Sequence, residues 1–305
     1  MKPLVVVTGA TGAIGGGVTE GLLQRGVRVR ALGRDPARLT ALAAMGAEPR
    51  SGMMEDVAFL DAALRGADAV FAMIPENPAA PDIHADKRRR AESLTAALRA
   101  AGVPRVVALS GTGVTPPTGI GPARALGEFE ARLASVPGLS TVTLRAAFLM
   151  ENLLGSIPLI RDAGIHGSPM RGDVPLAMVA KRDVADAAAE LLAAPESMGH
   201  TVRPLLGPRD YTWAEATAIL GGAIGRPDLP YLQFPSDDFR SGIIASGASP
   251  SMADALLELF AAFDAGRIQA LTARDAAGTT PTSLETFARE TFAPAFGPLP
   301  AVGSA

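Results

Sequence analysis

Residues 4–15 read Leu-Val-Val-Val-Thr-Gly-Ala-Thr-Gly-Ala-Ile-Gly, and this stretch decides the fold. A β-branched run ends at Thr8, glycines follow at positions 9, 12 and 15, and a helix-like run covers residues 18–24. The pattern is typical of a buried parallel strand that turns sharply into a helix. Glycines permit the tight turn and let a phosphate approach the backbone, where the N–H groups of the helix start can bind a dinucleotide pyrophosphate. The alternative is a glycine-rich turn without a ligand. The residues expected around the pyrophosphate are Gly9, Thr11, Gly12, Ala13, Ile14 and Gly15.

Length and composition narrow the class of protein. A chain of 305 residues can bury a large core, either as one domain or as a core with a cap. Charged residues make up 19% and the net charge is −3, which does not point to a nucleic-acid or acidic-membrane partner. The absence of cysteine excludes disulfides, thiolate catalysis and cysteine-ligated metal centres. No run approaches the roughly 18 apolar residues of a membrane span, so we expect a cytoplasmic protein without a membrane partner.

Strand and helix patterns alternate regularly over the first half of the chain. Such alternation predicts an α/β fold, a Rossmann-type doubly wound parallel sheet. Asp35 and Asp56 are expected to cap two of the helices, the first with Pro36 at its first position. Strands are expected at residues 4–8, 27–32, 68–74, 106–110 and 141–145, with a further strand ending near 51 and a long helix at about 84–101.

Beyond residue 150 the rhythm breaks, and proline and glycine at 155–175 predict an irregular segment. A helix is expected at 181–194, a short strand at 202–206 and a helix at about 251–263. The pairs Thr212/Glu215 and Thr282/Glu285 have the spacing of capping boxes, each starting a helix. We therefore expect an NAD(P)-binding Rossmann core and a smaller C-terminal substrate or cap lobe. The core would comprise residues 1–150, with about 174–206 returning to the sheet, and the lobe residues 151–173 and 207–305.

Arg34 lies just past the second expected strand, where the adenine ribose of a bound dinucleotide should lie. NAD-preferring folds place an acidic residue there to bind the ribose 2′-hydroxyl, whereas the planar fork of an arginine suits a 2′-phosphate. The alternative is a solvated surface arginine. The sequence therefore favours NADP(H), with NAD(H) possible.

Other positions at the expected carboxyl edge of the sheet are candidates for the same site. Met53 can pack on the purine face, and Ile74 and Pro75 should line the path of the second ribose. Ser110 ends the fifth strand at the topological position where nicotinamide and substrate meet. An ordinary strand-end serine that satisfies a backbone group is an equally weighted alternative.

With these elements placed, the chain resembles the NmrA-like branch of the atypical short-chain dehydrogenases, and within it bacterial NAD(P)H:quinone oxidoreductase-type proteins. The resemblance covers about residues 3–292 and implies a Rossmann core, NADP(H) or NAD(H), and members that reduce quinones or sense cofactor redox state. Phe148 and Asn152 match family positions close to the nicotinamide. Two positions depart from the pattern: Leu126 replaces a histidine or lysine, and Met53 replaces an acidic residue. The segments that carry the resemblance are 7–15, 28–36, 106–111, 144–152, 206–208 and 252–259.

The tyrosine and lysine pair of most short-chain dehydrogenases is missing. Four residues after Tyr211 and Tyr231 stand Glu215 and Pro235 rather than lysine. Reduction of an ordinary ketone makes an alkoxide that needs a positioned acid, whereas a quinone gives a phenolate that delocalises its own charge. A site without the pair can therefore reduce quinones by proximity and orientation. Ser110 and Asn152 are the expected catalytic residues, because they can stabilise the developing anion.

The remaining polar and apolar clusters have simpler interpretations. The three histidines lack metal-ligand spacing, so no metal site is expected. The basic run 87–90 is interpreted as a solvated helix surface, and the carboxylates Glu128 and Glu130 as caps or surface charge. The apolar stripe of residues 256–263 is expected in the core or a lid, with a substrate or dimer surface as the alternative.

Two functional hypotheses remain. The first is a hydride transfer from NAD(P)H to a small aromatic or quinone-like acceptor. It predicts an apolar, roomy pocket beside the nicotinamide. The second is a non-catalytic NmrA-type redox sensor that acts through a protein partner. It predicts a closed site and an exposed apolar patch. An isomerase or a reductase acting on a polycyclic aromatic product also stays open, as does the choice between monomer and homodimer.

Overall fold

A seven-stranded sheet forms the centre of the computed structural model, which describes residues 2–114, 120–194, 199–268 and 274–297. Its strand order is β10-β6-β5-β4-β1-β2-β3, and every neighbouring pair is parallel. The chain moves outward from β1 in one direction and from β4 in the other, so a topological switch point lies between these two strands. The expected α/β doubly wound sheet is confirmed. The strands are β1 Leu4–Val7, β2 Arg28–Gly33, β3 Glu48–Ser51, β4 Ala69–Ala72, β5 Arg105–Gly111, β6 Ser140–Ala146 and β10 His200–Leu205.

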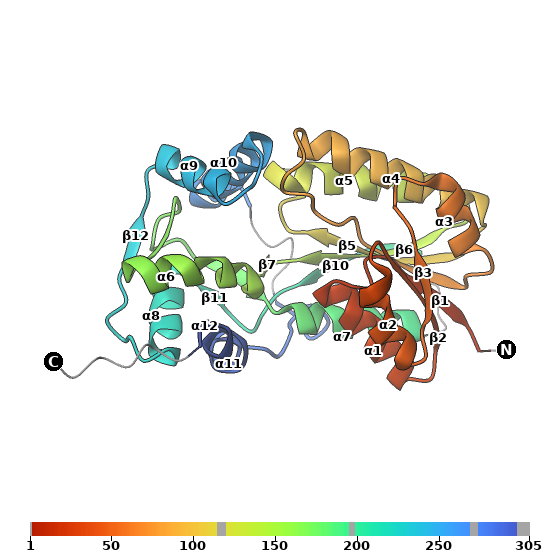
Figure 1. The fold of residues 1–305 in the computed structure, drawn as a ribbon, viewed down its shortest axis with the longest axis horizontal. Helices are drawn as coiled ribbons and strands as arrows, with labels where there is room; N and C mark the ends of the chain where they lie inside the picture. The colour runs from red at the N-terminus through yellow and green to blue at the C-terminus, as the bar shows by residue number, and fades with distance from the viewer. Residues whose placement is uncertain (1, 115–119, 195–198, 269–273, 298–305) are drawn as a thin grey trace.

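Helices cover both faces of this sheet (Figure 1). One face carries α1 Ala13–Gln24, α2 Pro36–Ala44 and α7 Lys181–Ala193, and the other carries α3 Val57–Leu64, α4 Ile83–Ala100 and α5 Arg124–Ala134. Each face has its own apolar core. The expected caps are confirmed, because the Asp35 carboxylate accepts from the N–H of Ala37 and that of Asp56 from the N–H of Phe59.

Small residues bring α1 and α7 into close contact. A Cβ added to Gly17 would lie 2.8 Å from the Cβ of Ala185, and one added to Gly21 would lie 3.0 Å from that of Ala189. Side chains larger than hydrogen would push the helices apart. The glycines that follow the first turn of α1 therefore fix its position under the sheet.

The C-terminal part of the chain builds a third apolar core beside the carboxyl edge of the sheet (Figure 1). It contains a three-stranded sheet in the order β11-β9-β7 and a parallel pair β12-β8. The segment 155–175, expected to be irregular, contains a helix and a strand. The elements are β7 Phe148–Leu149, η2 Met150–Ser156, α6 Ile157–Ala163, β8 His166–Ser168, β9 Leu176–Val179, β11 Asp210–Tyr211, α8 Trp213–Ala223, β12 Tyr231–Gln233, α9 Ser236–Ala245, α10 Pro250–Asp264, α11 Leu284–Phe287, η3 Ala288–Phe292 and α12 Ala293–Phe296, with η1 Gly121–Ala123 before α5.

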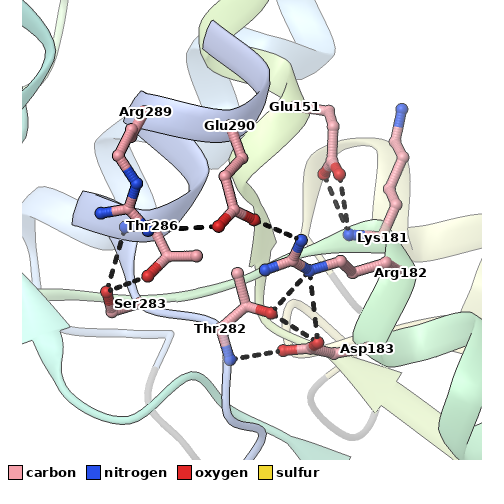
Figure 2. Close-up of polar contacts among 9 residues, drawn as sticks. All are labelled: Glu151, Lys181, Arg182, Asp183, Thr282, Ser283, Thr286, Arg289 and Glu290. Carbon is pink, nitrogen blue, oxygen red and sulfur yellow. Dashed lines mark hydrogen bonds and ion pairs between the residues drawn. The ribbon is translucent and has the colours of Figure 1, made fainter. Parts of the chain in front are cut away.

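One of the two expected capping boxes is present. Thr212 and Glu215 cap α8 reciprocally, but the prediction for Thr282 and Glu285 is wrong. Ser283 caps α11 instead, through a bond from the N–H of Thr286. Figure 2 shows the reason: the Thr282 hydroxyl donates to Asp183 at the start of α7, 2.6 Å away, and its N–H donates to the same carboxylate at 3.0 Å. A partner 99 residues away in the sequence outcompetes the local cap.

The interpretation of residues 87–90 as a solvated surface is also wrong for two of the four. Lys87 is buried and forms an ion pair with Glu76, and Arg90 is buried between Asp86 and Glu55. Arg90 also donates to the carbonyl of Pro75 at 3.0 Å. The Lys87–Glu76 ion pair and the bond from Arg90 to Pro75 hold the loop after β4 against α4, and that loop contributes to the site described next.

The candidate cofactor and acceptor site

A cavity of about 1190 Å³ lies between the carboxyl edge of the sheet and the C-terminal lobe. The sheet contributes segments at or just beyond the carboxyl ends of four strands, at residues 12–14, 73–76, 109–113 and 146–149. The lobe contributes a mainly apolar wall from η2, α6, α9 and α10. Eight of the expected site residues line the cavity: Gly12, Ala13, Ile14, Ile74, Pro75, Ser110, Phe148 and Asn152. The other five, Gly9, Thr11, Gly15, Arg34 and Met53, lie outside its lining.

The glycine turn fits a dinucleotide phosphate. Gly9 has a φ of +63°, and a Cβ on Gly15 would lie 2.3 Å from the carbonyl oxygen of Gly9, so both positions require glycine. The N–H of Gly12 closes the turn on that same oxygen at 2.9 Å. Because the first N–H groups of a helix have no partner within the helix, those of Ala13 and Ile14 remain available beside the cavity.

Two arginines flank the region where the adenine ribose would lie. Arg34 follows β2 directly and is exposed, and its guanidinium makes no hydrogen bond with the described residues. Arg38, which sequence reasoning missed, donates from Nη2 to the carbonyl of Thr11 at 2.7 Å and so reaches over the glycine turn. The neighbouring Asp35 is committed to capping α2. Met53 is 48% exposed, so its side chain is free to contact a bound ring.

Ser110 belongs to a buried polar network. Its hydroxyl donates to Glu130, whose carboxylate is held by Arg145 through Nε at 3.0 Å and Nη2 at 2.6 Å. The Glu130 and Arg145 side chains are 13% and 11% exposed, so the interpretation of Glu130 as surface charge is wrong. The network commits the Ser110 proton to Glu130, and therefore the hydroxyl presents lone pairs rather than a proton to the cavity.

Neither tyrosine phenol is free to act as an acid. Tyr211 donates to Glu285 at 3.2 Å, and Tyr231 donates to the carbonyl of Met170 at 2.6 Å. Burial raises the pKa of both phenols above the ordinary value. Leu126 lines the cavity, at the position where the family resemblance predicts a histidine or lysine. The proton donor that ordinary ketone reduction requires is therefore missing from these positions.

Four polar side chains line the cavity without a hydrogen-bond partner among the described residues: Thr112, Asn152, Lys181 and Asp238. Lys181 is the one cation among these four. Lys181 begins α7, where both oxygens of the Glu151 carboxylate accept from its backbone N–H at 3.0 Å (Figure 2). Its side chain extends away from that carboxylate and forms no salt bridge within the described part of the chain. Sequence reasoning identified Asn152 but missed Lys181, because no local pattern distinguishes a cavity-facing lysine from a surface one.

The apolar stripe of α10 supplies part of the cavity wall. Leu256, Leu259, Phe260 and Phe263 line the cavity, so both the core interpretation and the substrate-surface alternative apply to it. The wall therefore suits an apolar, ring-shaped ligand.

Among the described residues no group of three or more metal-ligating side chains exists, and no helix is long and apolar enough to cross a membrane.

Comparison with known proteins agrees with this geometry. The sequence pattern of a family described as NAD(P)H-binding matches residues 9–195. The chain belongs to this family. An NAD(P)H azoreductase from Xenophilus azovorans is 31% identical to it over 260 residues, which cover 85% of this chain and 86% of the relative. A (4-alkanoyl-5-oxo-2,5-dihydrofuran-3-yl)methyl phosphate reductase from Streptomyces griseus is 37% identical over 84% of this chain and 85% of the relative.

A solved structure extends the match to the whole fold. The NADPH complex of a quinone oxidoreductase from Escherichia coli superposes with a TM-score of 0.79 at 25% identity, covering 94% of this chain and 99% of that one. The expected family resemblance and the expected nicotinamide cofactor are confirmed.

Proposed function

We propose that this chain is a reductase that uses NADPH in preference to NADH and delivers a hydride to quinones or similar planar conjugated acceptors. The observation that carries the proposal is the cavity, which joins the glycine turn to an apolar lobe and has a volume of about 1190 Å³. Sites for drug-sized ligands have roughly 300–1,000 Å³, so the space suits a nicotinamide together with a ring system.

The cofactor, when bound, supplies the hydride. The N–H groups of Ala13 and Ile14 would hold its pyrophosphate, and Arg34 with Arg38 would hold a 2′-phosphate. Because both phenols are committed elsewhere, the chain offers no tyrosine acid to the acceptor. An acceptor that delocalises its own negative charge is therefore favoured over a simple ketone.

Asn152 and Lys181 are the chain's candidates for stabilising that charge. Both face the cavity, and neither the amide nor the ammonium is committed to a hydrogen bond with a described residue. Ser110, whose proton is committed to Glu130, is better suited to orienting a bound group as an acceptor. This division of roles revises the expectation that Ser110 stabilises the anion.

The relatives are named for reductions of azo compounds and quinones, which supports an enzyme rather than a sensor. A sensor would need no acceptor space beside its cofactor. The large cavity with its apolar wall from α10 therefore favours the hydride-transfer hypothesis over the NmrA-type alternative.

A turnover screen tests the proposal. NADPH oxidation is measured with 2-methyl-1,4-naphthoquinone, 1,4-benzoquinone and cyclohexanone, and again with NADH. We expect turnover with the quinones and hardly any with the ketone. Lys181→Met and Asn152→Ala should each lower kcat by roughly 10- to 100-fold with little change in the NADPH Kd. Ser156→Ala is the matched control, because Ser156 lines the same cavity but its hydroxyl donates to the carbonyl of Leu153 at 2.6 Å.

Efficient reduction of cyclohexanone would contradict the acceptor class, because it would show that a group in the cavity, such as the Lys181 ammonium, protonates the alkoxide. An equal loss of kcat in the Ser156→Ala control would show that Lys181→Met and Asn152→Ala act through the shape of the cavity and not through charge.

A further inference from the structure

A buried histidine reaches the same cavity from the C-terminal lobe. His166 begins β8 and is 1% exposed, yet it lines the cavity wall. Its ring centroid lies 5.5 Å from that of Trp213 and 5.9 Å from that of Tyr231. Trp213 in turn contacts Phe148, with centroids 5.7 Å apart, and Phe148 lies next to the sheet edge. The histidine therefore lies at the aromatic end of the cavity, away from the glycine turn.

The hydrogen bonds around His166 fix its tautomer. Nδ1 lies 2.6 Å from the hydroxyl oxygen of Thr217, and that hydroxyl donates its hydrogen to the carbonyl of Trp213 at 2.8 Å. A hydroxyl has one hydrogen to donate, so Thr217 must accept from Nδ1–H. Burial lowers the pKa of His166 to about 4, so the ring is neutral near pH 7. Nε2 therefore carries a lone pair and no proton.

That lone pair has no partner within the described part of the chain. Nδ1 faces Thr217 on α8, and His166 lines the cavity. Because Nε2 lies on the other side of the ring from Nδ1, we infer that Nε2 faces the cavity. The neighbouring donors are already used. Tyr231 donates to Met170 O, so Ser168 donates to the Tyr231 oxygen at 3.1 Å, and Trp213 Nε1 donates to the sulfur of Met170 at 2.9 Å.

We propose that His166 Nε2 accepts a hydrogen bond from a hydroxyl or amino group on the end of the acceptor that lies in the C-terminal lobe. A ligand that fills the cavity excludes water from this lone pair, and a donor on the ligand avoids the penalty of leaving the acceptor unpaired. Because the surrounding wall is aromatic and apolar, the preferred molecule has a flat ring body with one polar hydrogen at its far end. This inference rests on the proposed reductase function and adds to it a determinant of acceptor choice.

Three isosteric quinones test the proposal. The probes are 1,4-naphthoquinones with hydroxymethyl, ethyl or methoxy at position 6, of which the hydroxymethyl compound alone carries a donor. We expect a kcat/KM for the hydroxymethyl compound that exceeds the other two by about tenfold, the value of one hydrogen bond. Similar values for all three in the wild-type protein would overturn the proposal.

Two variants separate the lone pair from the shape of the wall. His166→Leu should abolish the preference while retaining activity on the ethyl compound. Thr217→Val keeps the ring but removes the acceptor for Nδ1–H, so the proton moves to Nε2 and the ring becomes a donor. The methoxy compound should then match the hydroxymethyl compound. A preference that survives in both variants contradicts the role of His166. Dividing the kcat/KM of a variant by that of the wild type for the same quinone removes the intrinsic reactivity of that quinone from the comparison.

Nitrogen NMR of the three histidine rings provides a reading that does not depend on turnover. The wild-type His166 should show a protonated Nδ1 and an unprotonated Nε2, and the Nε2 resonance should shift when the hydroxymethyl compound is added without NADPH. A protonated Nε2, or no shift at saturating compound, overturns the inference. Failure of all quinones to consume NADPH, with the shift still present, would contradict the proposed function and leave the binding role supported.

Discussion

Replacing Gly12 by alanine tests the glycine cradle with the smallest side chain that can obstruct a bound phosphate. An added Cβ would lie 3.3 Å from the carbonyl oxygen of Gly9, with no other heavy atom within 4 Å. The φ of −90° and ψ of 168° at Gly12 are also open to alanine. We therefore expect the variant to fold, with a free energy of unfolding within about 1 kcal/mol of wild type. The methyl group instead occupies the open side of Gly12, which lines the cavity.

A pyrophosphate displaced from this position loses one or two charge-assisted hydrogen bonds, each worth about 1.5–3 kcal/mol. The Kd for NADPH should therefore rise at least about tenfold. Gly16→Ala is the matched control, because its Cβ would lie 3.4 Å from the carbonyl of Ala10 and Gly16 does not line the cavity. Calorimetric titration of both variants with NADPH makes the comparison. Wild-type affinity in Gly12→Ala, or an equal loss in Gly16→Ala, would refute the placement of the pyrophosphate.

Three further predictions concern cofactor choice, stability and pH. Arg34→Ala should weaken NADPH binding by about 10- to 100-fold and NADH binding hardly at all, since a bidentate contact to a 2′-phosphate is worth about 1.5–3 kcal/mol; equal losses in titrations of both cofactors would indicate a structural role. Arg145→Met leaves the Glu130 carboxylate without its ionic partner and should lower the free energy of unfolding, measured in urea, by about 3–5 kcal/mol. The double variant Arg145→Met/Glu130→Leu should lose less stability, because it leaves no unpaired charge. An equal loss of stability in the single and double variants would contradict the pairing of these two residues. The pKa of His166 is lower in the folded state than its ordinary value of 6.5, so its contribution to stability is present above pH 6.5 and is lost as the pH falls toward about 4. The loss should approach about 3 kcal/mol in unfolding measured across this range, and a His166→Leu variant with an unchanged pH profile would contradict it.

The parts of the fold that depend on neighbouring residues could be predicted from the sequence. The strand, glycine turn and helix at the start of the chain follow from local backbone requirements, and the structure shows the positive φ of Gly9 and the steric limit at Gly15. The caps at Asp35 and Asp56 likewise involve contacts two or three residues away. Local rules decide such features, and so the sequence alone indicates them.

Features that depend on distant contacts could not be predicted in this way. Glu130 resembles any helical surface carboxylate until β5 and β6 place Ser110 and Arg145 against it. Thr282 has the local pattern of a cap, but Asp183 from another helix binds it. His166 reaches the cavity only because the lobe packs against the sheet edge, and Lys181 only because α7 begins at this edge. Packing between segments, which no local periodicity encodes, determines these assignments.

The most direct test of the central claim is the stoichiometry of an anaerobic reaction between NADPH and 2-methyl-1,4-naphthoquinone with the purified protein. The account predicts catalytic turnover in which one NADPH is consumed for each hydroquinone formed, because hydride transfer moves two electrons at once. NADPH that binds tightly but is not consumed with this quinone, or with any other in the panel, would contradict the account and favour the redox-sensor hypothesis.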